Sequence, residues 1–353
     1  MSLDPPRKIL VVRRDNIGDL VCTTPLIAAL RHRFERAWIG VLVNSYNAPV
    51  LDGNPDLDEV FVYTKAKHRA GGESLPGILW RRMQMMRRLR DMRLDDVIIA
   101  TTSPQPRVVR LARWLAPRRI IGFGEVAGLD VALPPDDAGR HEVEDVFRVA
   151  SLYGIDGAPP ACRVVAASGV APAREGNPGR STTIRPGHPG HPTVGIHISA
   201  RKPSQRWPAE RFAELIDALA GLGAPRFMLL WSPGGDDNPL HPGDDAKAAE
   251  VLKKVGAGAT VDARPTQSLR ELIAALAECD VVVCADGGAM HLAAGLGLPI
   301  VCLFGNSGAD RWRPWGVPYR LLQKPSLDVG DITVAETVAA FNALQAGIPA
   351  PSA

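Results

Sequence analysis

The sequence has no long apolar run and no segment typical of a secretory signal. Its 353 residues are 46% hydrophobic, yet no stretch approaches the roughly 18 to 20 apolar residues that a membrane-spanning helix needs. The apolar segment that follows residues 1–8 is too short for a secretory h-region. These absences exclude an integral membrane protein and predict a cytoplasmic globular one.

Cysteine is scarce and odd in number. The five cysteines lie in scattered, mostly apolar segments, at Cys22, Cys162, Cys279, Cys284 and Cys302. This distribution disfavours a disulfide framework or a zinc site and predicts buried free thiols. His188 and His191 have no further metal-ligand types at suitable spacing, so we expect loop residues there and no bound metal.

Two nucleotide-binding motifs are missing after the first expected strand. The segment from Arg13 to Asp19 contains neither Gly-x-Gly-x-x-Gly nor a Walker loop. This absence disfavours a nicotinamide-dependent oxidoreductase. The segment instead places a carboxylate, Asp19, next to Gly18, where it either acts as a general base or caps the following helix.

Hydrophobic patterning indicates an α/β protein with two domains. The chain is longer than one ordinary core requires, and apolar strands alternate with helical segments, as in parallel sheets covered on both faces. Strands are predicted at 8–12, 38–43, 60–63, 97–100, 119–122, 193–198, 227–231, 260–262, 281–285, 300–304 and 319–322. Helices are predicted from residue 24 onward and at 208–219, 245–255, 269–277, 290–296 and 334–346.

The pattern divides the chain into two Rossmann-like domains. We expect the first over residues 1–165, a Gly- and Pro-rich linker over 166–192, and the second over 193–330. The helix within 331–353 is expected to pack back on the first domain. Paired domains of this kind bind ligands at the carboxyl ends of their strands, so we expect the two parallel sheets to face a central cleft.

Residues 65–119 are strongly basic. They contain 14 Lys or Arg and 4 Asp or Glu, and Arg87 and Arg88 fall on a predicted helix. Such a block is either a solvated helix face or a surface for a polyanion, namely a nucleic acid, an anionic lipid or a phosphorylated glycan.

Residues 281–296 read as a buried strand, a tight turn and the start of a helix. Asp286 ends the strand, Gly287 and Gly288 allow a sharp turn, and the free N–H groups of the new helix attract phosphate. His291 lies in the first turns of that helix. It is either a packed side chain or a hydrogen-bond donor to a leaving phosphate.

A second polar segment follows the first strand of the second domain. Its hydroxyl, amide and cationic side chains predict contacts to a diphosphate, and they belong to Ser199, Arg201, Lys202, Gln205 and Arg206. The acidic loop with Asp236, Asp237, Asp244 and Asp245 is a weaker candidate for ribose hydroxyls, or else it is exposed to solvent.

Three segments resemble glycosyltransferase family 9, the inverting ADP-heptose:lipopolysaccharide heptosyltransferases. They are Arg13 to Asp19 with Thr24-Pro25-Leu26 behind it, Ser204 to Phe212, and Ala285 to Ala294 with Leu303-Phe304-Gly305. They occur in both halves of the chain in order. The resemblance implies a GT-B fold, a nucleotide-sugar donor bound mainly by the second domain, and a glycan acceptor bound by the first.

The resemblance also implies roles for individual residues. Asp19 would deprotonate the acceptor hydroxyl, with Arg14, Asn16 and Gly18 near the acceptor. The donor would be ADP-heptose, bound by the polar segment and by the Asp286 turn, with no cofactor and no metal. The acceptor would be an anionic lipopolysaccharide core, which would engage Arg87 and Arg88 at the cytoplasmic face of the inner membrane and leave no role for nucleic acid.

The sequence departs from the family pattern at two positions. The family usually has Lys where Gln205 stands, and Lys202 is a candidate replacement. The family's hydroxyl residue after the turn aspartate is Gly287 here, which removes one phosphate hydrogen bond. A non-catalytic glycan- or nucleotide-binding relative is therefore the alternative function, with an oxidoreductase less favoured.

Overall fold

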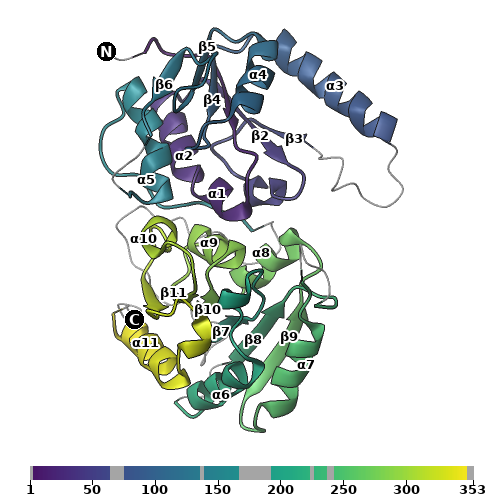
Figure 1. Cartoon of the computed structure of the whole chain (residues 1–353), viewed down its shortest axis with the longest axis vertical. Coiled ribbons are helices and arrows are strands. Elements are labelled where there is room, and N and C mark those ends of the chain that lie inside the picture. The colour runs from purple at the N-terminus through teal and green to yellow at the C-terminus, as the bar shows by residue number, and fades with distance from the viewer. Residues whose placement is uncertain are drawn as a thin grey trace. The chain divides into compact units, whose positions relative to one another are not determined.

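The computed structural model describes residues 3–63, 75–135, 139–166, 192–222, 226–236 and 242–347. Within these ranges the chain forms two compact units, Met1–Pro160 and Ala161–Ala353. Each unit contains one six-stranded sheet in which all the paired strands are parallel. The expected α/β class with two Rossmann-like domains is confirmed (Figure 1).

The first unit has the strand order β3-β2-β1-β4-β5-β6. Its strands are β1 Lys8–Val12, β2 Trp38–Asn44, β3 Glu59–Tyr63, β4 Asp96–Ile99, β5 Arg119–Phe123 and β6 Val131–Leu133. Its helices are α1 Ile17–Val21, α2 Thr24–Arg33, α3 Leu75–Asp91, α4 Pro106–Leu115 and α5 Glu142–Phe147, with 3₁₀ turns at Ala48–Leu51 and Arg148–Tyr153. Apart from their first residues, Lys8 and Asp96, the central strands β1 and β4 are apolar and buried, as expected for a parallel sheet covered by helices on both faces.

The second unit repeats this topology, with the order β12-β11-β10-β7-β8-β9. Its strands are β7 Thr193–His197, β8 Arg226–Trp231, β9 Thr260–Pro265, β10 Val281–Ala285, β11 Ile300–Phe304 and β12 Tyr319–Gln323. Its helices are α6 Ala209–Ala220, α7 Asp245–Lys254, α8 Leu269–Ala277, α9 Gly288–Gly295, α10 Ala309–Trp312 and α11 Val334–Ala346, with 3₁₀ turns at Pro203–Gln205 and Val329–Asp331.

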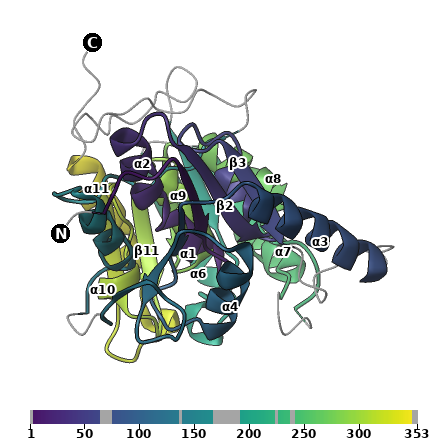
Figure 2. The same ribbon diagram turned by 90° about the horizontal axis from the view of Figure 1, so that it is seen from above.

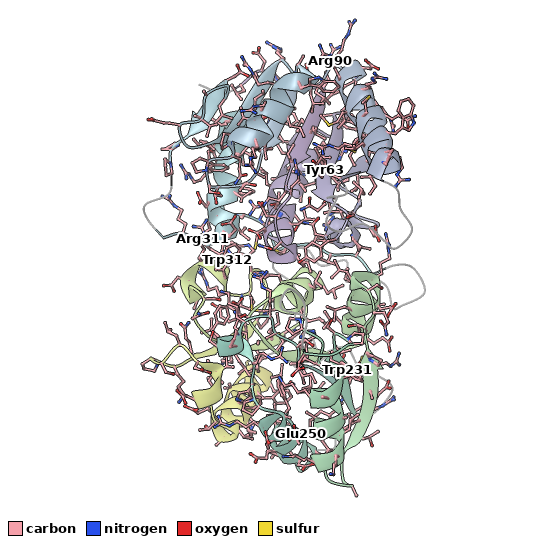
Figure 3. All side chains as sticks on the ribbon, turned by 45° about the vertical axis from the view of Figure 1, so that its right-hand side comes forward. Tyr63, Arg90, Trp231, Glu250, Arg311 and Trp312 are labelled. Carbon is pink, nitrogen blue, oxygen red and sulfur yellow. The ribbon has the colours of Figure 1, made fainter. Side chains whose placement is uncertain are left out.

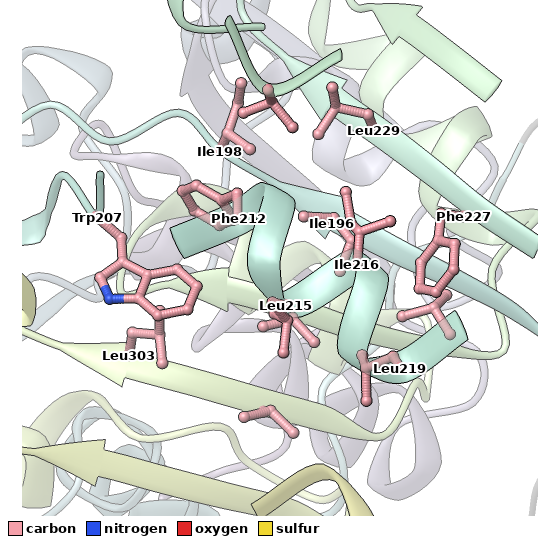
Figure 4. Packing of buried hydrophobic residues seen from close by; sticks show 14 of the residues in the cluster. Ile196, Ile198, Trp207, Phe212, Leu215, Ile216, Leu219, Phe227, Leu229 and Leu303 are labelled. Atoms are coloured by element: carbon pink, nitrogen blue, oxygen red, sulfur yellow. The ribbon is translucent and has the colours of Figure 1, made fainter. Parts of the chain in front are cut away.

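The core of the second unit forms between α6 and the sheet. Trp207 and Phe212 meet edge to face with ring centroids 4.9 Å apart, and Figure 4 shows Leu215, Ile216 and Leu219 continuing the packed row. The indole Nε1 of Trp207 donates to the Ile332 carbonyl at 2.9 Å. This hydrogen bond fixes the segment that leads from the candidate site into α6.

Two domain boundaries differ from the sequence expectation. The units divide at Pro160 and Ala161 because Val164 already belongs to the second unit, where its N–H donates to the Gly295 carbonyl at 2.8 Å. The C-terminal helix α11 packs against α6, β11 and β12 of the second unit, where we expected packing on the first. Most of the predicted linker, residues 167–191, lies outside the described residues, as do His188 and His191.

The five cysteines are free and buried, as predicted. Burial raises the pKa of the Cys279 and Cys284 thiols well above the ordinary value, so both stay protonated at neutral pH. No helix in the described ranges is long and apolar enough to cross a membrane.

Candidate active site

The strand order places the candidate residues at the switch point of each sheet. In the first unit β1 and β4 are neighbours from which the chain runs to opposite sides, and in the second unit β7 and β10 are the corresponding pair. Ligands of open α/β sheets bind beyond the carboxyl ends of such strands. The segment Arg13 to Asp19 follows β1, and the turn at Asp286 follows β10.

A buried arginine organises the turn after β1. The side chain of Arg13 is 1% exposed, and its Nη2 lies 2.7 Å from both Asp19 Oδ1 and Glu142 Oε1. Its Nε is 3.1 Å from Asp15 Oδ2, and its Nη1 donates to the Ala100 carbonyl. Burial alone would lower the pKa of Arg13, but the carboxylates of Glu142, Asp19 and Asp15 outweigh it and raise that pKa. The Arg13 guanidinium therefore stays positively charged in contact with the Asp19 carboxylate.

The Asp19 carboxylate has two structural contacts and keeps an exposed edge. Its Oδ2 accepts hydrogen bonds of 3.0 Å from both the backbone N–H and the side-chain Nδ2 of Asn16, which forms a capping box at the start of α1. Its Oδ1 accepts the bond from Arg13, and the side chain is 13% exposed. Asp19 therefore caps α1, and the same contacts orient its carboxylate at the end of β1. The neighbouring Gly18 is buried.

Two arginines stack on one tyrosine at the end of β3. The guanidinium carbons of Arg14 and Arg82 lie 3.9 and 4.2 Å from the centroid of the Tyr63 ring. Burial, together with the charge of Arg82, lowers the pKa of Arg14, and its Nε is buried without a hydrogen-bond partner among the described residues. Two adjacent cations that share a ring favour an anionic ligand. Sequence analysis included Arg82 only as a member of the basic block and did not single out Tyr63, because the three residues come from three separate segments of the chain.

The predicted basic block is partly neutralised. Arg88 binds both carboxylate oxygens of Glu59, with Nη1–Oε1 at 2.6 Å and Nη2–Oε2 at 2.9 Å. Other arginines of the block form ion pairs, namely Arg113 with Asp130, Arg118 with Asp4 and Arg119 with Asp96. Arg87 is exposed on α3. Both helix arginines predicted to bind an acceptor are therefore exposed, and Arg88 is already paired with Glu59.

In the second unit, four polar side chains meet beside the N-terminus of α9. Gln205 is 6% exposed, and its Nε2 donates to Asp286 Oδ2 at 2.8 Å and to Ser307 Oγ at 3.0 Å. The Nζ of Lys202 lies 3.4 Å from the same Ser307 hydroxyl. The structure therefore joins the two donor segments predicted from the sequence. It also adds Ser307, which follows β11 at the same edge of the sheet.

The turn from β10 into α9 is built on glycine. Gly287 has φ +153°, a backbone conformation that favours glycine, although a Cβ there would meet no atom within 4 Å. Gly288 begins α9. His291 is buried, and its ring lies edge-on to Trp312, with centroids 6.0 Å apart. Figure 3 shows Trp312 beside Arg311 on α10.

Other residues predicted to bind the donor stabilise the polar segment that follows β7, residues 199–206. Ser199 Oγ accepts from the Ser232 N–H at 2.9 Å. Arg206 forms an ion pair with the buried carboxylate of Asp244 and donates to the Ala200 carbonyl, whereas Arg201 is exposed. The charge of Arg206 is thus matched within the unit.

The acidic loop is also engaged in contacts within the unit. Asp245 accepts from Trp231 Nε1 at 2.7 Å and from the Gly234 N–H at 2.8 Å, and these two bonds lower the pKa of its carboxyl. Asp237 lies outside the described residues. Ribose binding by this loop stays a prediction.

Two buried basic residues, His197 and Lys247, lie close to the start of the polar segment. Burial, reinforced by the nearby charge of Lys247, lowers the pKa of His197 to about 4. Burial also lowers the pKa of Lys247 to about 8, and its Nζ donates to the Ile198 carbonyl at 2.9 Å. At neutral pH the imidazole is therefore neutral. Among the described residues, no three His, Cys, Asp or Glu side chains are grouped closely enough to hold a metal ion.

Comparison with known proteins identifies the family. The family model for glycosyltransferase family 9 (heptosyltransferase) matches residues 82–327, which is most of the chain. The chain belongs to glycosyltransferase family 9.

Relatives in this family match over nearly the whole chain. Lipopolysaccharide heptosyltransferase 2 of Salmonella typhimurium is 25% identical over 323 residues, which cover 90% of this chain and 88% of the relative. A family 9 glycosyltransferase from Veillonella parvula superposes with a TM-score of 0.77 at 20% identity and covers 98% of each chain. The E. coli heptosyltransferase WaaC with ADP gives a TM-score of 0.74 at 17% identity, covering 96% of this chain and 99% of that one. These likenesses confirm the GT-B class of the two Rossmann-like units.

Proposed function

We propose that this family 9 glycosyltransferase transfers a heptose from a nucleotide-diphosphate sugar, ADP-heptose in the first instance, to an anionic glycan such as the lipopolysaccharide core. The observation that carries the proposal is the convergence of Lys202, Gln205 and Asp286 beside the N-terminus of α9. The Salmonella relative is named as a lipopolysaccharide heptosyltransferase, and one similar E. coli structure contains ADP. Both support this donor and this acceptor class.

In the proposed reaction Asp19 is the general base. Its carboxylate accepts the proton of the acceptor hydroxyl, and the oxygen then bonds to the anomeric carbon of the donor. The bond from that carbon to the diphosphate breaks at the same time. Attack from the face opposite the diphosphate inverts the anomeric configuration. Arg13 holds the carboxylate in position through its 2.7 Å contact with Oδ1.

The leaving nucleoside diphosphate takes the electron pair of the broken bond. In this proposal the Lys202 ammonium and the free N–H groups at the start of α9 offset its charge, while Gln205 holds Asp286 and Ser307 in place through its two amide N–H donors. Because these groups supply positive potential, the reaction proposed for this chain is independent of a metal ion.

The proposed acceptor is anionic because of the arginines in the first unit. Arg14 and Arg82 place two guanidinium groups on the Tyr63 ring at the carboxyl end of β3. Such a pair suits the carboxylate or phosphate groups of a charged glycan. Arg87 adds an exposed cation on α3.

Donor binding and product stereochemistry test this proposal. A thermal-shift series with ADP-, GDP-, UDP- and dTDP-sugars at equal concentration should give its largest shift with ADP-heptose, since a ligand at 100 times its Kd stabilises the folded state by about 2.7 kcal/mol. Proton NMR of the transfer product should show inversion, and EDTA should leave the rate unchanged. A larger shift with another nucleotide sugar, a retained configuration, or a rate abolished by EDTA and restored by Mg²⁺ would contradict the corresponding part.

A further inference from the structure

Helix α3 has an apolar face that the fold does not bury. Within the described part of the chain, three large hydrophobic side chains of this helix are exposed, Leu79 at 57%, Trp80 at 56% and Met83 at 45%. At 100° per residue these three positions fall within about 100° of one another on the helix surface. We call them the α3 apolar face.

The other side of α3 already anchors the helix. Leu89 is fully buried in the core of the first unit, and Met85 and Met86 pack against that core. Burial of a helix stripe on a core accounts for one apolar face only. The exposed part of the α3 apolar face is not needed to anchor the helix, and its exposure to water is unfavourable unless something covers it.

The charges on α3 identify what would cover it. The helix carries five arginines and one acidic residue, Asp91. Arg81, Arg87 and Arg90 are exposed, so cations surround the α3 apolar face or continue along the same side of the helix. A surface that combines Trp and Leu with arginines is typical of helices that lie in the interface of an anionic bilayer.

The shape of the helix agrees with a planar partner. Figures 1 and 2 show that the N-terminal half of α3, which carries the apolar face, extends away from the sheet of its unit. A projecting convex helix suits a flat lipid surface, in which an indole ring favours the headgroup region. We infer that the α3 apolar face docks this protein on an anionic lipid bilayer, through insertion of Leu79, Trp80 and Met83 between headgroups that bind the neighbouring arginines.

Vesicle co-sedimentation of the full chain tests this inference without using the proposed reaction. The wild-type chain should bind vesicles of phosphatidylethanolamine and phosphatidylglycerol, bind phosphatidylcholine vesicles weakly, and dissociate at high salt. The triple variant Leu79→Ser, Trp80→Ser, Met83→Ser should lose at least about tenfold in its partition coefficient for the anionic vesicles. The variant should stay folded in circular dichroism with only a small fall in melting temperature, because all three side chains are largely exposed and lie outside the core of the unit.

A matched control distinguishes binding through the α3 apolar face from non-specific hydrophobic binding to vesicles. Leu222 is 61% exposed in the second unit, so Leu222→Ser removes a similar apolar side chain elsewhere. This control should bind vesicles as the wild type does. Equal binding by the triple variant, or equal loss in the control, would overturn the inference. So would a lipid-free dimer in sedimentation velocity that only the triple variant abolishes, since the face would then pair two copies.

The failure of this inference differs from a failure of the proposed function. If the triple variant loses vesicle binding but still transfers sugar to a lipid-free acceptor, docking is supported as a separate property. If no nucleotide sugar binds the wild type while the vesicle results hold, only the proposed reaction is contradicted.

Discussion

At the scale of single residues, Lys202 and Gln205 share one position in the candidate donor site. Lys202 Nζ and Gln205 Nε2 lie 3.4 and 3.0 Å from the same oxygen, Ser307 Oγ. Gln205 also donates to Asp286, but an amide brings no charge. Of these two residues only Lys202 is charged, so we propose that it supplies the positive charge that the family pattern places at position 205.

This sharing predicts coupling between the two positions. Lys202→Ala should raise the KM for ADP-heptose about tenfold, since it removes a charge-assisted contact to phosphate, whereas Gln205→Lys should lower it. In the Gln205→Lys background the effect of Lys202→Ala should shrink, because the new lysine supplies the charge. Steady-state kinetics of the wild type, the two single variants and the double variant give the coupling free energy. If the effects of the two substitutions on KM were strictly additive, the proposal that Lys202 replaces the family lysine would be contradicted.

At the scale of elements, the short turn Pro203–Gln205 depends on close approach to the end of β11. A Cβ on Gly305 would lie 2.3 Å from the Ser204 carbonyl oxygen, so only glycine fits beneath this turn. The turn carries Gln205 to its contact with Asp286. The close packing of the turn at residues 203–205 on Gly305 thus sets the position of Gln205.

Gly305→Ala should displace this turn. We expect a loss of about 1 to 3 kcal/mol in the free energy of unfolding and a clear rise in the Kd for ADP-heptose, because Gln205 moves away from Asp286. Gly308→Ala is the matched control on the same loop, since a Cβ there meets no atom within 4 Å. Urea unfolding and calorimetric titration measure the two effects. Similar behaviour of the two variants would show that the close approach is unimportant.

The long elements were predictable because their apolar patterns are continuous. Strands β1, β10 and β11 match the predicted ranges, and each is buried over nearly its whole length. The short elements were missed. Strand β6 has three residues and no buried side chain, and α5 and α10 are too short to show a helical period. Glu142 at the start of α5 and Ser307 before α10 were missed with them, although Glu142 contacts Arg13 of the segment predicted after β1 and Ser307 contacts the predicted site residue Gln205.

At the scale of the whole molecule, the two units place polar groups in the same way, at the carboxyl ends of their strands. Both sheets have Rossmann strand order, and both present polar side chains from the loop that follows the first strand. Sequence patterning was sufficient to predict this repetition. It could not assign α11, because an apolar stripe does not specify its partner, and Ala340, Phe341 and Leu344 join the core of the second unit. The cations on Tyr63 depend on tertiary structure alone.

The central claim is that the chain is a transferase with Asp19 as its base, and one rate comparison tests it most directly. The initial rate of heptose transfer from ADP-heptose should fall by at least about 10²-fold in Asp19→Asn, while donor binding is kept. Asp15→Asn, which removes another carboxylate from Arg13, should cost much less. A rate for Asp19→Asn within a few-fold of wild type, or an equal loss in Asp15→Asn, would contradict the account.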